Sequence, residues 1–258
     1  MFRNSELMKL HQDMKTKPWL GRMEPFRIIG NTYFCGTFQA SCHIVDTGEG
    51  LILIDPGYAN ALYLIVDSIY RLGFKPEDVK YIVNTHWHGD HTEATAQLAA
   101  LTGATTIIAR DDVERAAKYF VPDVIIDDGF ELRLGDTVMT FLLTPGHTKG
   151  TVSLFWDTEE DGVSYRLGMF GGAGVNTMAK GKLDFPEGRE AYRASLNRLR
   201  GERVDVMIGN HTWNNDTYGK GIRLLAGGEN EFIDGALFAK FLDSCEARLD
   251  AVIAKDDE

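Results

Sequence analysis

The six residues from His86 to His91, with the sequence HWHGDH, constrain this chain more than any other feature. They place three imidazoles and a carboxylate just beyond the apolar run Val79–Val83, and the whole chain has only seven histidines. Imidazole nitrogen and carboxylate oxygen are the usual protein ligands of zinc and neighbouring divalent metals. Structural zinc sites often include cysteine, and this stretch has none. The sequence therefore predicts an open, catalytic metal site.

The spacing within this stretch indicates two metal ions. His86 and His88 are two residues apart, so they point to the same side of an extended segment and can hold one ion. Asp90 and His91 follow where the chain turns into a helix, which directs them toward a second ion. Paired catalytic metals lie about 3.5–4 Å apart. Four residues of the stretch are thus predicted ligands.

Two further histidines also end apolar strands. His147 lies in the segment TPGHT after the run 138–143, and His211 ends the segment IGNH. Taken alone, each would be an ordinary polar loop residue. Ligands gather at strand ends in open α/β sheets, however, so a fold that brings these ends together surrounds one centre with histidines.

Composition and charge narrow the class of protein. Of the 258 residues, 44% are hydrophobic and 25% are charged, which permits one large domain with a sizeable core. The formal net charge of −11 argues against a nucleic-acid partner, which needs a basic footprint. No apolar run reaches the roughly 18 residues of a membrane span. We therefore expect a small-molecule substrate, no nucleic acid and no membrane, with the oligomeric state left open.

The N-terminus and the cysteines bear on the compartment. Residues 1–17 are polar and lack the apolar core of a secretory signal. This predicts a cytoplasmic protein, or a periplasmic or secreted one whose signal has been removed. The three cysteines are an odd number and predict buried thiols, not a disulfide framework. We expect residues 1–24 to form an N-terminal extension and 25–258 a single domain.

Strands and helices recur in two halves of the chain. Strands are predicted at 26–30, 32–36, 42–46, 51–55, 79–85 and 105–109, and then at 128–134, 137–143, 151–157, 164–170 and 204–208. Helices are predicted at 59–72, 92–101, 188–199 and 235–255. Two strand-rich halves that each carry helices predict an α/β fold of four layers, an αββα sandwich of two mixed sheets with outer helices.

Together these motifs resemble the metallo-β-lactamase superfamily. The chain has the His-x-His-x-Asp-His motif, the TPGHT segment and the late strand-end histidine, and LIDPG at 53–57 resembles the early motif. The resemblance implies the αββα fold, two zinc ions per chain rather than iron or manganese, and a supporting role for Asp55 behind the ligands. The implied ligands are His86, His88 and His147 for one zinc and Asp90, His91 and His211 for the other.

The resemblance is greatest to the third subclass of metallo-β-lactamases and runs over about residues 25–255. Many superfamily hydrolases carry a bridging aspartate in a segment that here reads FGGAGV, at 170–175, with no carboxylate. The third subclass also lacks that bridge. The resemblance implies a zinc-dependent hydrolase in which a metal-bound hydroxide opens a β-lactam ring, with catalytic Asp90 both binding metal and orienting the nucleophile.

Several departures from that subclass fall near the expected substrate pocket. Gly172, Ala173 and Gly174 stand where serines usually help to hold the drug carboxylate, and residues 93–94 replace the usual glycines. Trp87 is bulky where a small residue is common, and Trp213 lies in a segment that usually has proline. We expect Trp87, Gly172, Ala173 and Trp213 to line the pocket.

These departures leave alternatives open. One is a metal-dependent hydrolase of a lactone, thioester or phosphoester with little or no β-lactamase activity. Others are an iron-dependent oxidoreductase, for which related proteins need a further flavin domain, and a metal-binding protein without turnover. Lys149, Lys180 and Lys182 are candidates to attract an anionic substrate, with solvated loop lysines as the alternative.

Overall fold

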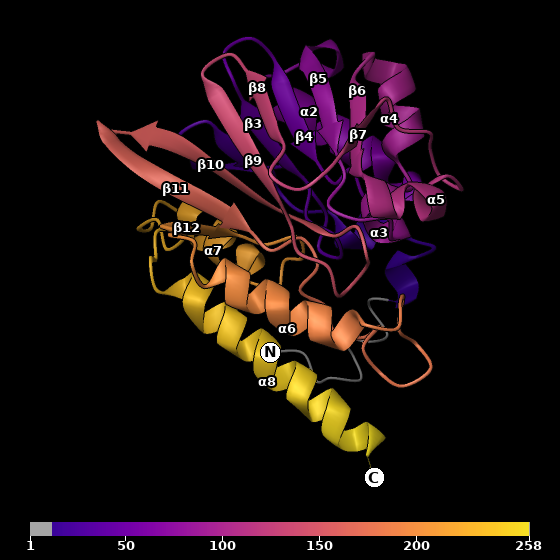
Figure 1. Ribbon diagram of the computed structural model, residues 1–258. Helices are drawn as coiled ribbons and strands as arrows, with labels where there is room; N and C mark the ends of the chain where they lie inside the picture. Colours follow the sequence, from indigo (N-terminus) through magenta and orange to yellow (C-terminus); the bar gives the residue numbers. More distant parts are fainter. Residues whose placement is uncertain (1–11, 258) are drawn as a thin grey trace.

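Two mixed β-sheets lie face to face between layers of helices in the computed structural model, which describes residues 12–257 (Figure 1). The first sheet contains, in spatial order, β1 (Phe26–Ile29), β2 (Thr32–Phe34), β3 (His43–Asp46), β4 (Leu51–Ile54), β5 (Val79–Val83), β6 (Thr105–Ala109) and β7 (Val124–Ile126). The second contains β12 (Val206–Ile208), β11 (Val163–Met169), β10 (Val152–Glu160), β9 (Thr137–Leu143) and β8 (Glu131–Leu134). The predicted αββα sandwich is confirmed.

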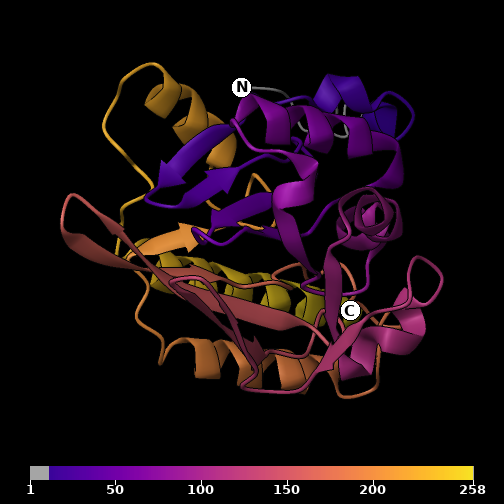
Figure 2. The same ribbon diagram turned by 90° about the horizontal axis from the view of Figure 1, so that it is seen from above.

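Helices cover the outer face of each sheet, as Figure 2 shows from above. The α-helices are α2 (Leu62–Arg71), α3 (Gly89–Thr92), α4 (Thr95–Thr102), α5 (Val113–Ala116), α6 (Gly188–Leu199), α7 (Thr217–Leu225) and α8 (Leu237–Asp256). Short 3₁₀ turns occur at η1 (Pro18–Gly21), η2 (Ala59–Ala61), η3 (Pro76–Asp78) and η4 (Arg110–Asp112). In the part of the chain described, no helix is both long and apolar enough to cross a membrane.

The strand directions bring several loops of the first sheet to the same edge of that sheet. Strands β1 to β4 are antiparallel, whereas β4 to β7 are parallel. In the second sheet only β11 and β12 are parallel. All four residues of β4, LILI, are buried because the other sheet covers one face and helices cover the other. Parallel strands end at the same edge, so β4, β5 and β6 deliver their following loops together.

Three apolar clusters fill the spaces between the four layers. Between the sheets, Phe34 packs in one cluster with Phe141 and Trp156, all fully buried. Outside the first sheet, Ile65 of α2 and Leu98 of α4 are buried against β4 and β5. A third cluster lies outside the second sheet, between that sheet and helices α6 and α8. Each cluster removes apolar side chains from water, which is the main favourable contribution to folding.

The element boundaries differ from prediction in several places. The predicted helix 92–101 is two helices, α3 and α4, that meet at Glu93 and Ala94. Strands β10 and β11 extend further than predicted, so the hairpin turn is only Asp161-Gly162, both with positive φ. Strand β7 and helices α5 and α7 were not predicted; α7 carries Gly219 and Gly221, which weaken its helical pattern.

The ends of the chain and the cysteines complete the description. Residues 1–11 of the predicted extension lie outside the described residues, whereas Met14 is buried and Arg22 forms a β-bridge with Thr37. Met14, Gly21 and Met23 are thus buried against the domain, whereas Trp19 and Leu20 between them are exposed. The three cysteines, Cys35, Cys42 and Cys245, are buried free thiols, as predicted.

Candidate metal centre

The loops that carry the predicted ligands are tied together where the two sheets meet. Val152, at the start of β10, donates its backbone N–H to the carbonyl of Thr85, which follows β5 (N···O 2.9 Å). Gly171 follows β11 at the same place. A Cβ on Gly171 would lie 2.1 Å from the Val152 carbonyl oxygen, so only glycine permits this approach. The junction holds His86 of the first sheet near the loops of the second.

His86, His88 and His147 form the first group of candidate ligands. One nitrogen from each lies within 4.8 Å of the others, and His88 Nδ1 is 2.9 Å from His147 Nε2. The His147 Nδ1–H donates to the Gly174 carbonyl at 2.8 Å, so a neutral His147 has its lone pair on Nε2. That lone pair faces the other two rings, the arrangement of ligands around one ion.

Asp90, His91 and His211 form the second group, again with one atom from each within 4.8 Å of the others. Asp90 Oδ2 lies 3.6 Å from His91 Nε2 and 3.7 Å from His211 Nε2. His211 Nδ1 donates to the Gln39 carbonyl at 2.7 Å. The two groups adjoin, since the ring centroids of His86 and His91 are only 4.3 Å apart.

Asp55 lies behind both groups. Its Oδ2 accepts hydrogen bonds from His91 Nδ1 at 2.9 Å and from Thr85 Oγ1 at 2.7 Å, and its Oδ1 accepts the Thr85 N–H at 2.8 Å. Because the Thr85 hydroxyl donates to Asp55, it accepts from His86 Nδ1, 3.0 Å away. Asp55 thus fixes His91 directly and His86 through Thr85, and both imidazoles direct Nε2 toward the centre.

The donor atoms at this centre fit a metal pair. His86 Nε2 and His91 Nε2 are buried and have no hydrogen-bond partner among residues 12–257. Burying a polar atom without a partner costs free energy, and buried polar atoms are nearly always satisfied. A divalent ion bound by each group would supply the missing partner. Five imidazoles and one carboxylate, without cysteine, match the nitrogen and oxygen donors that zinc accepts.

Burial holds most of these imidazoles in the neutral form that binds metal. It lowers the pKa of His88 and His211 to about 4 and that of His147 to about 3, and it lowers the pKa of His86 well below its usual value. Neighbouring imidazoles add to the effect of burial at each ring. These four histidines are therefore neutral at pH 7, as metal ligation requires.

The Asp90–His91 pair behaves differently. Burial opposes ionisation of Asp90, but the neighbouring His91 and His211 outweigh it and lower the pKa of the Asp90 carboxyl. Burial also opposes charging of His91, but Asp90 and Asp55 outweigh it and raise the pKa of that imidazole. The second group therefore carries a carboxylate that favours a cation, either a proton on His91 or a metal ion.

Asp112, which sequence reasoning missed, joins the two ligand loops. Its buried carboxylate accepts the N–H of Trp87 at 2.9 Å, the Thr148 hydroxyl at 2.7 Å and the Gly150 N–H at 2.7 Å. Trp87 stands between His86 and His88, and Thr148 follows His147. Asp112 comes three residues after β6, so the rule that pointed to the histidines, a polar residue shortly after a strand end, also applies to it.

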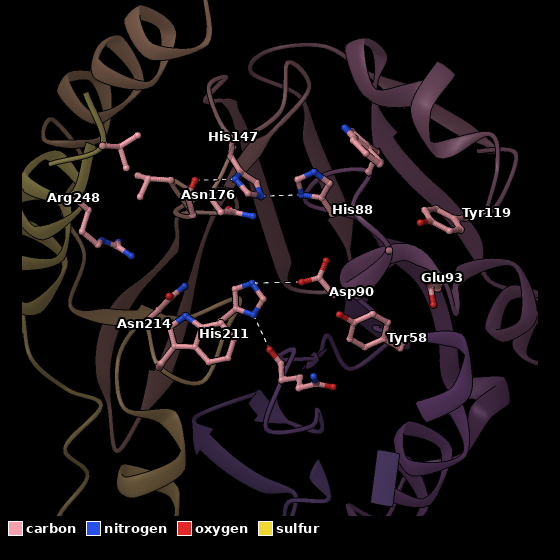
Figure 3. Close-up of a pocket in the computed structure, with 17 residues that line it drawn as sticks. Tyr58, His88, Asp90, Glu93, Tyr119, His147, Asn176, His211, Asn214 and Arg248 are labelled. Carbon is pink, nitrogen blue, oxygen red and sulfur yellow. Dashed lines mark hydrogen bonds and ion pairs between the residues drawn. The ribbon is translucent and has the colours of Figure 1, made fainter. Parts of the chain in front are cut away.

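A cavity of about 760 Å³ opens over the two groups (Figure 3). Trp87 and Trp213 line it, and the Trp213 indole stacks on the His211 ring with centroids 4.4 Å apart. Gly172 and Ala173 lie behind His147 rather than on the cavity wall: Ala173 is buried, and a Cβ on Gly172 would lie 2.9 Å from His147 Cβ. The next residue along the chain, Gly174, lines the cavity in their place.

Further lining residues come from segments that carried no signal in the sequence. Tyr58, Glu93 and Tyr119 lie on one side of the ligand groups, and Asn176, Asn214 and Arg248 lie on the other (Figure 3). They belong to separate loops and to α8, so only the tertiary fold brings them together.

The three lysines considered as anion attractors do not line this cavity. Lys149 is paired with Asp111, with Nζ 3.1 Å from Oδ1. Lys180 and Lys182 are exposed on the loop before α6. A cation that faces the cavity therefore comes from elsewhere in the chain.

The sequence matches a family model, and the fold is similar to that of solved structures. Residues 35–211 match the family model described as the metallo-beta-lactamase superfamily. The fold is similar to the FEZ-1 metallo-beta-lactamase from Legionella gormanii, with a TM-score of 0.86 and 28% identity over 92% of this chain and 98% of that chain. It is also similar to BJP-1, a subclass B3 metallo-beta-lactamase of Bradyrhizobium japonicum, with a TM-score of 0.86 and 28% identity over 94% and 98% of the two chains.

Curated relatives have other activities. A hydroxyacylglutathione hydrolase of Methylococcus capsulatus is 35% identical over 156 residues, which are 60% of this chain and 54% of the relative. An N-acyl homoserine lactonase of Bacillus thuringiensis is 28% identical over 151 residues, 47% of this chain and 59% of the relative. The matches thus span little more than half the length of these relatives.

Proposed function

The chain belongs to the metallo-beta-lactamase superfamily of hydrolases, and from this premise we propose that it is a two-zinc hydrolase that opens β-lactam rings. The observation that carries the proposal is the pair of three-donor groups, one of three imidazoles and one of Asp90 with two imidazoles. The segment 170–175 adds no carboxylate between them. The likeness to a subclass B3 enzyme over 98% of that chain supports the same reading.

The ligands and their supports have distinct tasks. His86, His88 and His147 would hold one zinc, and Asp90, His91 and His211 the other. When bound, zinc lowers the pKa of a coordinated water to about 7 and polarises the carbonyl under attack. Asp55 holds His91 at 2.9 Å and, through Thr85, holds His86, so neither ring can turn its Nε2 away from the centre.

Asp90 is the proposed catalytic residue. It lines the cavity, its side chain is 28% exposed, and the neighbouring His91 and His211 keep its carboxyl pKa low, so it is ionised at neutral pH. An ionised carboxylate accepts a hydrogen bond from the attacking water and thereby directs the water oxygen at the carbonyl carbon. Asp90 lines the cavity together with His88 of the first group and His211 of the second, so the carboxylate lies at the opening over both groups.

The cavity suits a small substrate with apolar and polar parts. Its volume of about 760 Å³ lies in the usual range for small-molecule sites, roughly 300–1,000 Å³. Trp87 offers aromatic surface beside His88 and Trp213 beside His211, whereas Asn176 and Asn214 offer amides. This combination can hold a cyclic amide while one bond is exposed to water, and such positioning lowers the barrier to reaction.

A second candidate is hydrolysis of a lactone or thioester, with a phosphoester as a further variant. Two observations favour it: the curated relatives are named a hydroxyacylglutathione hydrolase and an N-acyl homoserine lactonase, and the segment Gly172–Gly174, of which only Gly174 lines the cavity, has no serine to hold a drug carboxylate.

A substrate screen on zinc-reconstituted protein tests the proposal. The panel contains a carbapenem, a chromogenic cephalosporin, an N-acyl homoserine lactone, an S-acyl glutathione and an aryl phosphodiester. We expect β-lactam turnover that a chelator abolishes and that the variant His86→Ala lacks, while its circular dichroism spectrum stays native. Turnover confined to the esters would replace the proposal by the second candidate. Turnover in His86→Ala equal to that of the wild type would overturn the metal assignment.

A further inference from the structure

Arg248 differs from every other arginine among residues 12–257. The others each form an ion pair with an aspartate or glutamate: Arg22, Arg27, Arg71, Arg110, Arg115, Arg133, Arg166, Arg189, Arg193, Arg198, Arg200, Arg203 and Arg223. Arg248 has no carboxylate partner within the described part of the chain. In a protein with 38 acidic and 27 basic residues, a guanidinium without such a partner is unexpected.

Neutral contacts hold the Arg248 side chain in place. Its Nε donates to the Ser244 carbonyl at 3.3 Å, and Nη2 donates to the Cys245 sulfur at 2.9 Å and to the Ala173 carbonyl at 3.5 Å. The guanidinium also lies over the Phe241 ring, 5.7 Å from its centroid. These contacts orient the group without neutralising it, and Nη1 makes no hydrogen bond to the described residues. The planar fork therefore keeps donors for a ligand.

Arg248 lies beside the candidate metal centre. It projects from α8 into the cavity, toward the side where His147, Asn176 and Asn214 lie (Figure 3). Its contact at the Ala173 carbonyl is one residue from the Gly174 carbonyl that holds His147 Nδ1 at 2.8 Å. A substrate that reaches the first ligand group can therefore also reach the guanidinium.

Outside the ligand groups, the charged side chains that line the cavity lie on opposite sides of those groups (Figure 3). Arg248 is the only lysine or arginine among the described lining residues. The opposite wall contains Glu93 with the hydroxyls of Tyr58 and Tyr119, and a Cβ on Gly89 would meet both the Glu93 carboxylate and the Tyr119 hydroxyl, so the two lie together. Lys118 Nζ lies 4.4 Å from the Trp87 ring centroid and 4.6 Å from that of Tyr119, but Lys118 does not line the cavity. Within the described lining, an anionic group is therefore repelled by Glu93 and attracted by Arg248.

We propose that Arg248 binds a carboxylate of the substrate that is remote from the bond being hydrolysed, and so makes this site selective for substrates with a free carboxylate. The inference rests on the proposed function, since it concerns the same cavity. Arginine forms paired, charge-assisted hydrogen bonds with a carboxylate, a geometry that a lysine point charge does not reproduce. Arg248 would supply from α8 the anchor that the segment Gly172–Gly174 does not provide.

The test compares a chromogenic cephalosporin acid with its methyl ester on zinc-loaded wild type and variants. In Arg248→Gln we expect kcat/KM for the acid to fall about 10- to 100-fold, mostly through KM, with the ester changed less than 3-fold. Arg248→Lys should recover part of the loss. The control Arg193→Gln removes ion pairs with Glu246 and Asp250 on α8, outside the cavity, and should leave both substrates unchanged. Equal losses on acid and ester would overturn the proposal.

A binding measurement separates this inference from the proposed function. The ring-opened acid and its methyl ester serve as unreactive ligands in calorimetric titrations of the zinc-loaded proteins. If the wild type hydrolyses no β-lactam, the proposed function fails. The inference about Arg248 still stands if the wild type binds the acid about 10- to 100-fold more tightly than Arg248→Gln does, and if both proteins bind the ester with the same affinity. Equal binding of the acid by both proteins overturns it, whatever the turnover.

Discussion

Asp55 and His91 lie 2.9 Å apart, from carboxylate Oδ2 to imidazole Nδ1, and both side chains are buried. The same oxygen accepts the Thr85 hydroxyl, which in turn accepts from His86 Nδ1. A single carboxylate therefore orients one imidazole of each three-donor group. Since a carboxylate that accepts from the far nitrogen of an imidazole fixes the tautomer and the angle of that ligand, the two groups share one structural support.

Replacing that carboxylate should weaken metal binding. Asp55→Asn keeps the shape, and asparagine tolerates the left-handed backbone that Asp55 adopts, with φ of +53°. An amide cannot accept all the hydrogen bonds that the carboxylate accepts, so we expect zinc affinity to fall about 10- to 100-fold in competition with a chromogenic chelator. Asp123→Asn is the matched control, because Asp123 accepts the N–H and hydroxyl of Thr106 far from any ligand. Equal zinc affinity in Asp55→Asn and wild type would contradict the assigned role.

Removing the Asp112 carboxylate should loosen both ligand loops. Its two oxygens accept three donors, whereas asparagine offers one oxygen, so Asp112→Asn leaves at least one buried N–H of Trp87 or Gly150 unpaired. An unpaired buried donor costs about 1–3 kcal/mol, which urea denaturation would detect as a lower midpoint. Zinc affinity should fall as well, because Trp87 stands between His86 and His88.

The neighbouring Asp111→Asn provides the control for that measurement. Asp111 is exposed and pairs with Lys149 at the surface, and surface ion pairs contribute at most about 1 kcal/mol. If Asp111→Asn and Asp112→Asn unfold at the same urea concentration, Asp112 is not the link between the loops.

These residues also show what sequence could and could not predict. The clustering of His, Asp and His residues at strand ends, together with the family resemblance, predicted the six candidate ligands, and the structure brings them together in two groups. The strand-end rule also applies to Asp112, which was missed because a single aspartate after β6 does not stand out among 38 acidic residues.

The cavity walls were less predictable for a physical reason. Arg248 lies 101 positions after His147 in the sequence, on a helix whose place over the second sheet depends on how α6 and α8 pack. Local pattern does not fix that packing. Gly172 and Ala173 were expected on the cavity wall from the positions of serines in related enzymes, but here the backbone turns them behind His147 and presents Gly174 instead.

A methyl group at Gly146 should displace His147. Gly146 has φ of +148°, and a Cβ there would lie 2.6 Å from Tyr192 Cβ and 2.7 Å from Tyr192 Cα. We expect Gly146→Ala to lose about 1–3 kcal/mol of unfolding free energy through overpacking against α6, and to lose zinc affinity. Gly181→Ala has a positive φ of +77° but no atom within 4 Å, so it isolates the backbone cost alone. If Gly146→Ala loses less unfolding free energy than Gly181→Ala, then α6 moves to make room for the methyl group and the predicted overpacking is wrong.

His43, which belongs to neither ligand group, should make stability depend on pH. It is buried at the start of β3, its Nε2 lies 3.0 Å from the Gly209 carbonyl, and burial lowers its pKa to about 4. The unfolded imidazole has a pKa of about 6.5, so the unfolded state takes up the proton first as the pH falls. The neutral ring therefore contributes stability that is complete above pH 6.5 and is lost between pH 6.5 and 4, about 3 kcal/mol in all.

The variant His43→Gln isolates this contribution, because glutamine retains a donor for the Gly209 carbonyl but does not titrate. It should be less stable than wild type at pH 7, having lost the ring contact with Phe34, whose centroid is 5.7 Å from that of His43. Urea unfolding with chelator present, at steps from pH 7 to 4.5, should show the difference shrink by about 2–3 kcal/mol, since the ligand histidines titrate alike in both proteins and cancel. A difference that stays constant with pH would mean that His43 is as easily protonated in the folded chain as in the unfolded one.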